Sequence, residues 1–246
     1  MKDSLKKNKN IIAIIPARGG SKSIKNKNII DLNGKPLIYY TINQALKSNE
    51  FTKVIVSTDS LSIAKIAEKC GAEVPFLRPK NISHDCPTEK VLIHASKYLE
   101  KYMSFDGVAC LQPTSPFRKI ESIKSCAKIF RSKKYDSVIT FKKVEAERPE
   151  WMFRKKNKLM IPYINKKKIN GKIIFGKNIA RQLYEKLYKP NGSIYITKKD
   201  ILYKYESIYG FNLCGYINDE YESHDIDTKL DFEFSKFLLK SLKLHN

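Results

Sequence analysis

Short apolar segments alternate with helical patterns through the first half of the chain, and this alternation constrains the fold more than any other feature. Ile11–Ile15, Val54–Ser57 and Gly107–Leu111 are short and apolar, as expected of buried strands. Helical patterns lie between them, one after Pro36 and one across Leu61–Lys69. Because strands joined by crossover helices pair in parallel, the sequence predicts an α/β fold with a mostly parallel sheet.

The helical patterns have recognisable ends and buried faces. Ser60 can cap Leu61–Lys69 and Gly71 can close it, a further helix is expected across Thr88–Tyr102, and Ala72–Leu77 is expected to be extended. In the helix after Pro36 the predicted buried face is Ile38, Ile42, Ala45 and Leu46. An amphipathic helix is also expected near the C-terminus, with the apolar positions Leu230, Phe234, Phe237 and Leu238.

Polar residues gather where the predicted strands and extended segments end. These clusters are Arg18–Lys22, Ser57–Asp59, Arg78 and Gln112–Ser115. In open α/β sheets, ligands bind beyond the carboxyl ends of the strands. The sequence therefore predicts an active site at this edge of the sheet.

The alternation of strands and helices breaks down between Lys142 and Lys189. Lysine-rich turns separate short apolar pieces there, and a strand resumes at "GSIYIT", residues 192–197. The interruption is either a disordered insertion or a small subdomain that packs against another copy. We expect residues 1–10 to form a basic tail and residues 11–246 to form a single domain, without internal repeats.

The chain is strongly basic, and the kind of basic residue matters. Lysine and arginine number 47 against 25 acidic residues, a net charge of +22, yet seven are arginine and the lysines occur throughout the chain. This balance is typical of a codon bias toward A and T. A basic nucleic-acid-binding protein remains an alternative, but it predicts a cationic stripe with interleaved aromatics. We expect no nucleic-acid partner. We also expect the few arginines to lie at positions where a rigid two-pronged hydrogen-bond donor is needed.

Cysteine usage and hydropathy indicate the cellular compartment in which the protein is expected. The five cysteines are odd in number and scattered, so they predict neither a disulfide framework nor a zinc site. No apolar stretch approaches the roughly 20 residues of a membrane-spanning helix, and the basic start of the chain is a poor secretory signal. We expect a cytoplasmic protein without a membrane partner.

The segment "PARGGSKSIKNKN", Pro16–Asn28, has the composition of an anion-binding loop. It matches neither G-x-x-x-x-G-K-[ST] nor G-x-G-x-x-G, because Gly19 and Gly20 are adjacent. Two glycines after a strand can still turn backbone N–H groups inward to form an anion nest, and the cations of the loop add charge. We expect phosphate binding, with an ordinary turn carrying solvated lysines as the alternative.

A pair of carboxylates lies in "HDIDTKLD", at Asp225 and Asp227. In an extended segment alternate side chains point the same way, so both carboxylates can reach one cation such as Mg²⁺. The alternative is that Asp227 caps the terminal helix. Two further segments, "LQPTSPFR" and "KPNGSIYI", present polar side chains beside a strand.

Together and in this order, these segments resemble the N-acylneuraminate cytidylyltransferases, also called CMP-sialic acid synthetases. The similarity runs from Ile11 to about Leu239 and includes "VIVSTDS", "AEVPFLRP", "RPEWMF", "RQLYEKLYKPNGSIYI" and "SHDIDTKLDF". This family transfers a cytidylyl group from CTP to the anomeric hydroxyl of a nine-carbon α-keto sugar acid and releases pyrophosphate. The resemblance implies a three-layer α/β sandwich with a Rossmann-like sheet of the nucleotide-diphospho-sugar transferase type. It also implies a homodimer, with Lys142–Lys189 as a dimerisation subdomain.

The resemblance assigns roles to individual residues. It implies that CTP is bound by Ala17, Arg18, Ser21, Lys22, Lys27, Asn28 and Arg78. It implies that the sugar acid is bound by Gln112, Arg181, Asn191 and Tyr195. It places Mg²⁺ on Asp225 and Asp227, which form the catalytic set together with Arg18 and Lys22. These residue types suit a reaction that needs positioning and charge neutralisation more than a covalent intermediate.

The chain departs from the family pattern at a few positions, and one related family remains an alternative. Lys189 stands where many members carry arginine, Trp151 lies where some carry a basic residue, and the spacing in "SHDCPT" leaves the roles of Asp85 and Thr88 open. The alternative is the cytidylyltransferase for 3-deoxy-manno-octulosonate, which usually reads R-x-P-G-K-P-L at the loop, whereas this chain has "KSIKNKN". Whether the substrate is N-acetylneuraminate, legionaminate or pseudaminate stays open.

Overall fold

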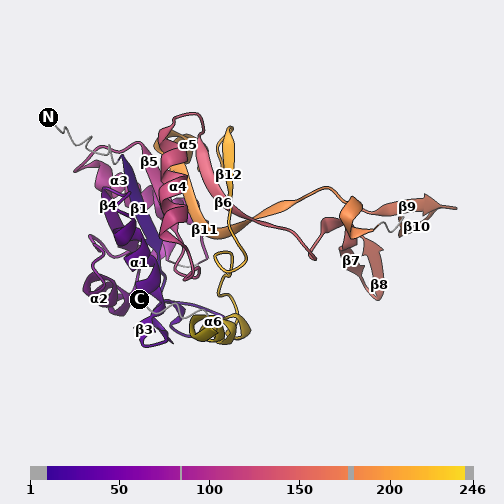
Figure 1. The fold of residues 1–246 in the computed structure, drawn as a ribbon, viewed down its shortest axis with the longest axis horizontal. Coiled ribbons are helices and arrows are strands. Elements are labelled where there is room, and N and C mark those ends of the chain that lie inside the picture. The colour runs from indigo at the N-terminus through magenta and orange to yellow at the C-terminus, as the bar shows by residue number, and fades with distance from the viewer. Residues whose placement is uncertain (1–9, 84, 177–179, 242–246) are drawn as a thin grey trace. The chain divides into compact units, whose positions relative to one another are not determined.

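The computed structural model of the protein describes residues 10–83, 85–176 and 180–241, which form two compact units (Figure 1). The first unit comprises Met1–Phe141 and Pro190–Asn246, and the second comprises Lys142–Lys189. Of the predicted basic tail, residues 1–9 lie outside the described residues. Among those described, no helix has the length and apolar character needed to cross a membrane.

The first unit is built on a six-stranded sheet with the order β12-β6-β11-β5-β1-β4. Its strands are β1 (Ile11–Pro16), β4 (Lys53–Ser57), β5 (Gly107–Leu111), β6 (Ser137–Lys143), β11 (Tyr188–Lys198) and β12 (Leu213–Ile217). β1 is parallel to both β4 and β5, and β6 is parallel to β12, whereas β11 runs antiparallel to β5. The predicted mostly parallel sheet is confirmed, and its apolar strands lie where the sequence predicts them.

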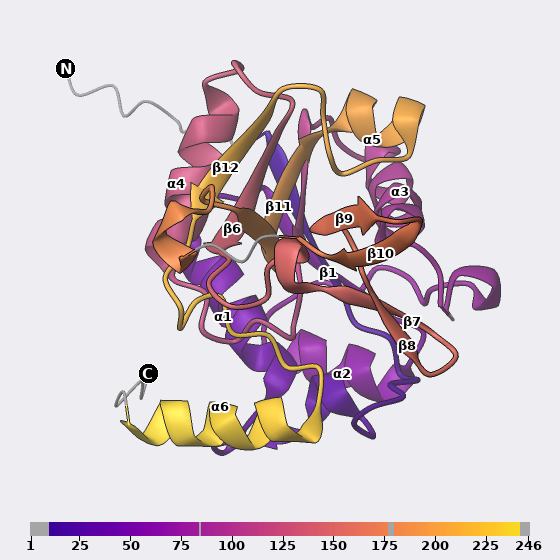
Figure 2. The ribbon, with the colours of Figure 1, turned by 90° about the vertical axis from the view of Figure 1, so that its right-hand side faces the viewer.

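Helices cover both faces of this sheet (Figure 2). They are α1 (Leu37–Ser48), α2 (Leu61–Lys69), α3 (Thr88–Glu100), α4 (Ile120–Arg131) and α5 (Lys199–Tyr205). Successive β1 side chains point to opposite faces, so Ile11 and Ile15 pack with α1, α2 and α4, while Ile12 and Ile14 pack with α3 and α5. The predicted three-layer α/β sandwich is therefore confirmed.

A third apolar cluster joins the terminal helix α6 (Lys229–Ser241) to the loop after β1. Phe232 and Leu239 of α6 are buried with Ile24 of that loop and Leu32 of the short β2–β3 hairpin, Asp31–Leu32 and Lys35–Pro36. Burial of each large apolar side chain contributes about 1.5–3 kcal/mol. The cluster thereby fixes the start of α6 close to the loop.

Some predicted details are wrong. Leu230 and Phe237 are 78% and 60% exposed, because α6 turns the stripe of Phe232, Ser235 and Leu239 toward its neighbours instead. In α1, Leu46 is 42% exposed although the rest of the predicted face is buried.

The helix predicted across Thr88–Tyr102 ends at Glu100. The segment expected to be extended, Ala72–Leu77, makes two isolated β-bridges, one to Ile55 of β4 and one to Thr58, which directly follows β4. A continuous ladder does not form because Pro75 has no N–H to donate.

The second unit contains two β-hairpins and two short 3₁₀ helices. The elements are β7 (Phe153–Lys156), β8 (Leu159–Pro162), β9 (Lys166–Ile169), β10 (Lys172–Phe175) and the 3₁₀ helices Pro149–Trp151 and Arg181–Leu183. The ring centroids of Phe153 and Phe175 lie 5.5 Å apart in a stacked arrangement that joins the hairpins. All residues of β7 and β9 are exposed, and isolated two-stranded hairpins are marginally stable in water.

The positive charge is less evenly distributed than the sequence interpretation assumes. Lys142–Lys189 holds 15 lysines and arginines and four acidic residues, so 48 residues carry +11 of the total +22. The other 198 residues carry the remaining +11. A codon bias acts on the whole chain and does not account for this local density.

Candidate active site

A cavity of about 760 Å³ lies at the carboxyl ends of β1 and β5. The loop after β1, the segment that leads into α3, the segment after β5 and Asp227 form its walls. Of the predicted site residues, the structure brings together in its lining Arg18, Ser21, Lys22, Lys27, Asn28, Arg78, Gln112 and Asp227. Ala17 is buried behind the loop, and its N–H donates to the Ser57 carbonyl at 2.9 Å.

The loop after β1 is shaped by its own side chains and by the end of β4. The Asn28 amide donates to the Arg18 carbonyl at 2.9 Å, and the Gly19 N–H donates to an Asp59 carboxylate oxygen at 2.8 Å. The predicted anion nest is therefore wrong at Gly19, whose N–H already has an anionic acceptor. A side chain at Gly19 would be tightly packed, since a Cβ there would lie 3.1 Å from the Ser60 Cβ.

Two cations of the loop share one carboxylate. Arg18 Nη1 lies 2.5 Å from Asp85 Oδ1, and Lys22 Nζ contacts Asp85 Oδ2. These two cations hold the pKa of Asp85 at about 2. Asp85, whose role the sequence leaves open, thus lies among the residues predicted to bind the triphosphate.

Arg78 connects β4 to the cavity. Its guanidinium is buried and donates from Nε to Ser57 Oγ at 3.2 Å and from Nη2 to the Ser57 carbonyl. Burial lowers the pKa of Arg78. Ser57–Asp59 therefore orients both the loop and Arg78, and Gln112 and Thr114 of the fourth predicted cluster line the same cavity.

A buried arginine that the sequence reasoning did not assign fixes the exit of β5. Arg118 is 2% exposed and donates to the carbonyls of Gln112 at 2.8 Å and Ser193 at 2.9 Å, and to Thr41 and Gln44 of α1. Burial lowers its pKa to about 10. The rarity of arginine, noted from composition, is the signal that could have singled it out.

Two of the predicted sugar-binding residues, Asn191 and Tyr195, do not line the cavity. Asn191 is buried, accepts from Thr140 at 2.6 Å and donates to Ser223 at 3.0 Å. Tyr195 is buried in β11, and burial raises its pKa. The backbone of Arg181 lies in the second unit, and its side chain is outside the described residues.

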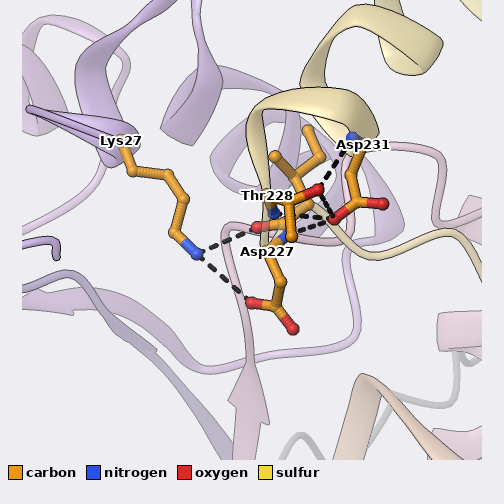
Figure 3. A network of polar contacts seen from close by, with 5 residues as sticks. Lys27, Asp227, Thr228 and Asp231 are labelled. Atoms are coloured by element: carbon orange, nitrogen blue, oxygen red, sulfur yellow. Dashed lines mark hydrogen bonds and ion pairs between the residues drawn. The ribbon is translucent and has the colours of Figure 1, made fainter. Parts of the chain in front are cut away.

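The two carboxylates of the predicted metal site lie in different surroundings. Asp227 lines the cavity, and its Oδ1 lies 3.3 Å from Lys27 Nζ, which also donates to the Ile226 carbonyl at 2.9 Å (Figure 3). Asp225 is largely enclosed, and burial, reinforced by the charge of Asp227, raises its pKa. Its Oδ1 is buried and has no hydrogen-bond partner among the described residues.

The start of α6 is capped by other residues than Asp227. Asp231 accepts from the backbone N–H groups of Thr228 at 2.7 Å and Asp227 at 3.1 Å, and its own N–H donates to Thr228 Oγ1 at 3.2 Å (Figure 3). This reciprocal arrangement pairs the N–H of Asp231 in the first turn and the N–H groups of Asp227 and Thr228 just before it. The Asp227 side chain is therefore not the helix cap.

The donor set of this pair fits a hard divalent cation. Asp227 lines the cavity and Asp225 has a buried unpartnered oxygen, and carboxylate ligands are typical of Mg²⁺ sites in which water and substrate phosphates complete the coordination. Within the described parts of the chain, no group of three or more His, Cys, Asp or Glu side chains could hold a metal ion.

Comparison with known proteins identifies the family. Residues 12–212 match the cytidylyltransferase family. The chain is 36% identical over 241 residues to the post-translational flagellin modification protein B of Campylobacter coli, covering 95% of this chain and 97% of that protein. It is 34% identical to the CMP-N,N'-diacetyllegionaminic acid synthase of Legionella pneumophila, covering 94% and 96%.

Further comparisons agree with this assignment. The N-acylneuraminate cytidylyltransferase of Escherichia coli is 36% identical over 92% of this chain, which spans 51% of that longer protein. A CMP:2-keto-3-deoxy-manno-octonic acid synthetase complexed with CTP shares the fold, with a TM-score of 0.68 at 16% identity and coverage of 95% and 99%. The chain therefore belongs to the cytidylyltransferase family, in the group of N-acylneuraminate and related sugar-acid enzymes that its sequence resembles.

Proposed function

We propose that this nucleotidyltransferase couples CTP to a nine-carbon α-keto sugar acid of the sialic, legionaminic or pseudaminic type, giving a CMP-sugar and pyrophosphate. The observation that carries the proposal is the cavity, in which cations of the β1 loop face a carboxylate of the pair that precedes α6. The relatives named for N-acylneuraminate and legionaminic acid support the sugar class. The octulosonate alternative has less support, because that enzyme shares the fold at 16% identity.

The loop cations supply the positive charge that the triphosphate needs. Arg18, Ser21, Lys22 and Lys27 line one wall of the cavity and are assigned to the phosphates. Asn28 and Arg78 line it beside them and are assigned, with the backbone at Ala17, to the cytidine. Fixed charges act strongly on the developing charge of a departing pyrophosphate, so Arg18 and Lys22 lower the barrier at that step.

Asp225 and Asp227 would hold Mg²⁺, which neutralises phosphate oxygens when it is bound. In the reaction, the anomeric hydroxyl oxygen forms a bond to the α-phosphorus, and the bond from the α-phosphorus to the pyrophosphate oxygen breaks. The hydroxyl proton leaves toward Asp225, which is assigned as its acceptor. Gln112 lines the cavity and is assigned to the sugar.

Asn191, Tyr195 and Arg181 are retained as sugar-site proposals, although Asn191 and Tyr195 make internal contacts. We place the enzyme in the cytoplasm and assign Lys142–Lys189 to homodimer formation. All five cysteines are free, which suits a reducing compartment. The exposed hairpin strands of the second unit suit burial against a second copy.

Nucleotide choice tests the proposal. Initial rates of pyrophosphate release are measured with CTP, UTP, ATP and GTP at equal concentration, with Mg²⁺ and a mixture of the three sugar acids. We expect turnover with CTP and at least about a hundredfold less with the others, since a site built to hydrogen-bond one base strongly rejects another. Equal turnover of UTP or ATP would remove the assignment of Asn28 and Arg78 to the cytidine.

A further inference from the structure

Asp85 holds the place of an anion in the cavity. It lies in the segment before α3, and its two carboxylate oxygens contact different cations of the β1 loop, Arg18 and Lys22. All three residues line the cavity. The contact spans 67 residues of sequence to Arg18, so it depends on the folded arrangement and is not a local turn.

This arrangement reproduces one feature of a bound phosphate. A carboxylate and a phosphate both offer two oxygens to a guanidinium and an ammonium. Any phosphate that uses Arg18 and Lys22 must therefore displace the carboxylate of Asp85 or share the two cations with it. Asp227 is the other carboxylate in the lining, and its ion pair is with Lys27.

We propose that Asp85 is a positioning residue that acts as an intramolecular counterion for the phosphate site and competes with the phosphates of substrate and product. The inference rests on the proposed function for its biological ligands, but its test does not require turnover. Before nucleotide binds, Asp85 keeps the Arg18 and Lys22 side chains directed into the cavity. After transfer of the cytidylyl group, the same carboxylate recaptures them and favours release of pyrophosphate.

The competition has a modest expected size. Asp85 and Lys22 are 58% and 78% exposed, and exposed ion pairs contribute little individually. Breaking the two pairs therefore costs a ligand on the order of 3- to 10-fold in affinity. Asp85→Asn keeps the size of the side chain and removes the charge. Every polyphosphate that binds there should therefore bind more tightly to this variant, by the same factor.

The probe is tripolyphosphate, which carries the phosphate chemistry without the base or sugar. Calorimetric titration without Mg²⁺ compares wild type, Asp85→Asn and Asp85→Ala. The matched control is Glu73→Gln, which removes one negative charge from the Lys53–Glu73 pair at 2.7 Å outside the cavity. We expect about 3- to 10-fold tighter binding in both Asp85 variants and less than a twofold change in the control.

A double-mutant cycle shows whether the effect passes through the two cations. In an Arg18→Gln, Lys22→Gln background, Asp85→Asn should leave tripolyphosphate affinity unchanged. Steady-state kinetics add a second readout, since Asp85→Asn should lower the KM for CTP and strengthen pyrophosphate inhibition. Unchanged or weaker tripolyphosphate binding in the Asp85 variants would overturn the proposal. Tighter binding without CTP turnover in wild type would leave Asp85 as the counterion and contradict the proposed function instead.

Discussion

Arg118 Nη2 lies 2.8 Å from the backbone carbonyl oxygen of Gln112, and the remaining nitrogens of this buried guanidinium bind Ser193, Thr41 and Gln44. One side chain thereby joins the exit of β5 to β11 and to α1. Gln112 lines the cavity, so the position of a proposed sugar-binding residue depends on an arginine outside the cavity lining.

Replacing Arg118 by Met should destabilise the first unit and slow the reaction. The substitution leaves buried carbonyl oxygens without donors, which costs about 3 kcal/mol or more when several acceptors lose their partner. Lysine should rescue little, because one ammonium cannot reproduce the fork of a guanidinium. Urea unfolding measures the loss, and Arg154→Met, at an exposed position on β7, is the control expected to change stability by less than about 0.5 kcal/mol. Stability equal to wild type in Arg118→Met would contradict this role.

Asp225→Asn and Asp227→Asn should each reduce kcat on the order of a hundredfold or more, a few kcal/mol in the transition state. Both should also require more Mg²⁺ for half-maximal rate, because the cation loses a charged ligand. The matched comparison is Thr228→Ala, which removes a capping contact of α6 and should cost about 1 kcal/mol of stability while leaving the Mg²⁺ response unchanged. Near-normal rates and Mg²⁺ dependence in both Asp variants would place the metal elsewhere.

The raised pKa of Asp225 predicts a pH-dependent effect of its replacement in the metal-free protein. A folded-state pKa above the unfolded value means that the folded protein binds the proton more tightly, so ionised Asp225 reduces stability at neutral pH. Asp225→Asn should therefore raise the urea midpoint at pH 7, and the gain should shrink as pH falls through the raised pKa, above the ordinary value of 3.8. Urea unfolding between pH 4 and pH 8 measures this difference. If the stability gain of Asp225→Asn grew on acidification, it would contradict a raised pKa for Asp225.

The proposed homodimer should strengthen as salt increases. If Lys142–Lys189 forms the interface, each copy brings a net charge of +11 to it. Salt shortens the Debye length from about 10 Å at 0.1 M, which weakens this repulsion while the apolar contacts remain. Light scattering over a protein dilution series at low and high salt measures the dissociation constant, which we expect to fall several-fold. A monomer at every salt concentration, with full activity, would refute the dimer.

The strands and the loop of this fold could be predicted because each depends on local chemistry. The apolar run of β1 ends at Pro16, and Ser60 accepts from the Ile63 N–H at the start of α2, as the sequence indicates. The cations Arg18, Lys22 and Lys27 of the loop after β1 line the cavity, and phosphate binding there stays a prediction. These features follow from neighbouring residues and from the period of strand and helix.

The missed features depend on contacts between distant segments. Arg118 and Asp85 acquire their roles from partners about 70 residues away, and nothing beside them in the sequence indicates those partners. In α6 the exposed positions Leu230 and Phe234 share helical spacing with each other, so periodicity alone could not choose between that stripe and the buried one at Phe232. Packing of Phe232 with Ile24 in one buried cluster determines which stripe of α6 is buried.

Formation of the CMP-sugar is the most direct test of the proposed reaction. CTP and Mg²⁺ are incubated with N-acetylneuraminate, with a legionaminate, with a pseudaminate and with 3-deoxy-manno-octulosonate, and the products are identified by mass spectrometry and ³¹P NMR. We predict one phosphodiester-linked CMP-sugar with a nine-carbon acid, formed in equal amount to pyrophosphate, and little or none with the eight-carbon acid. A product with the octulosonate alone, or pyrophosphate release without any sugar adduct, would contradict it.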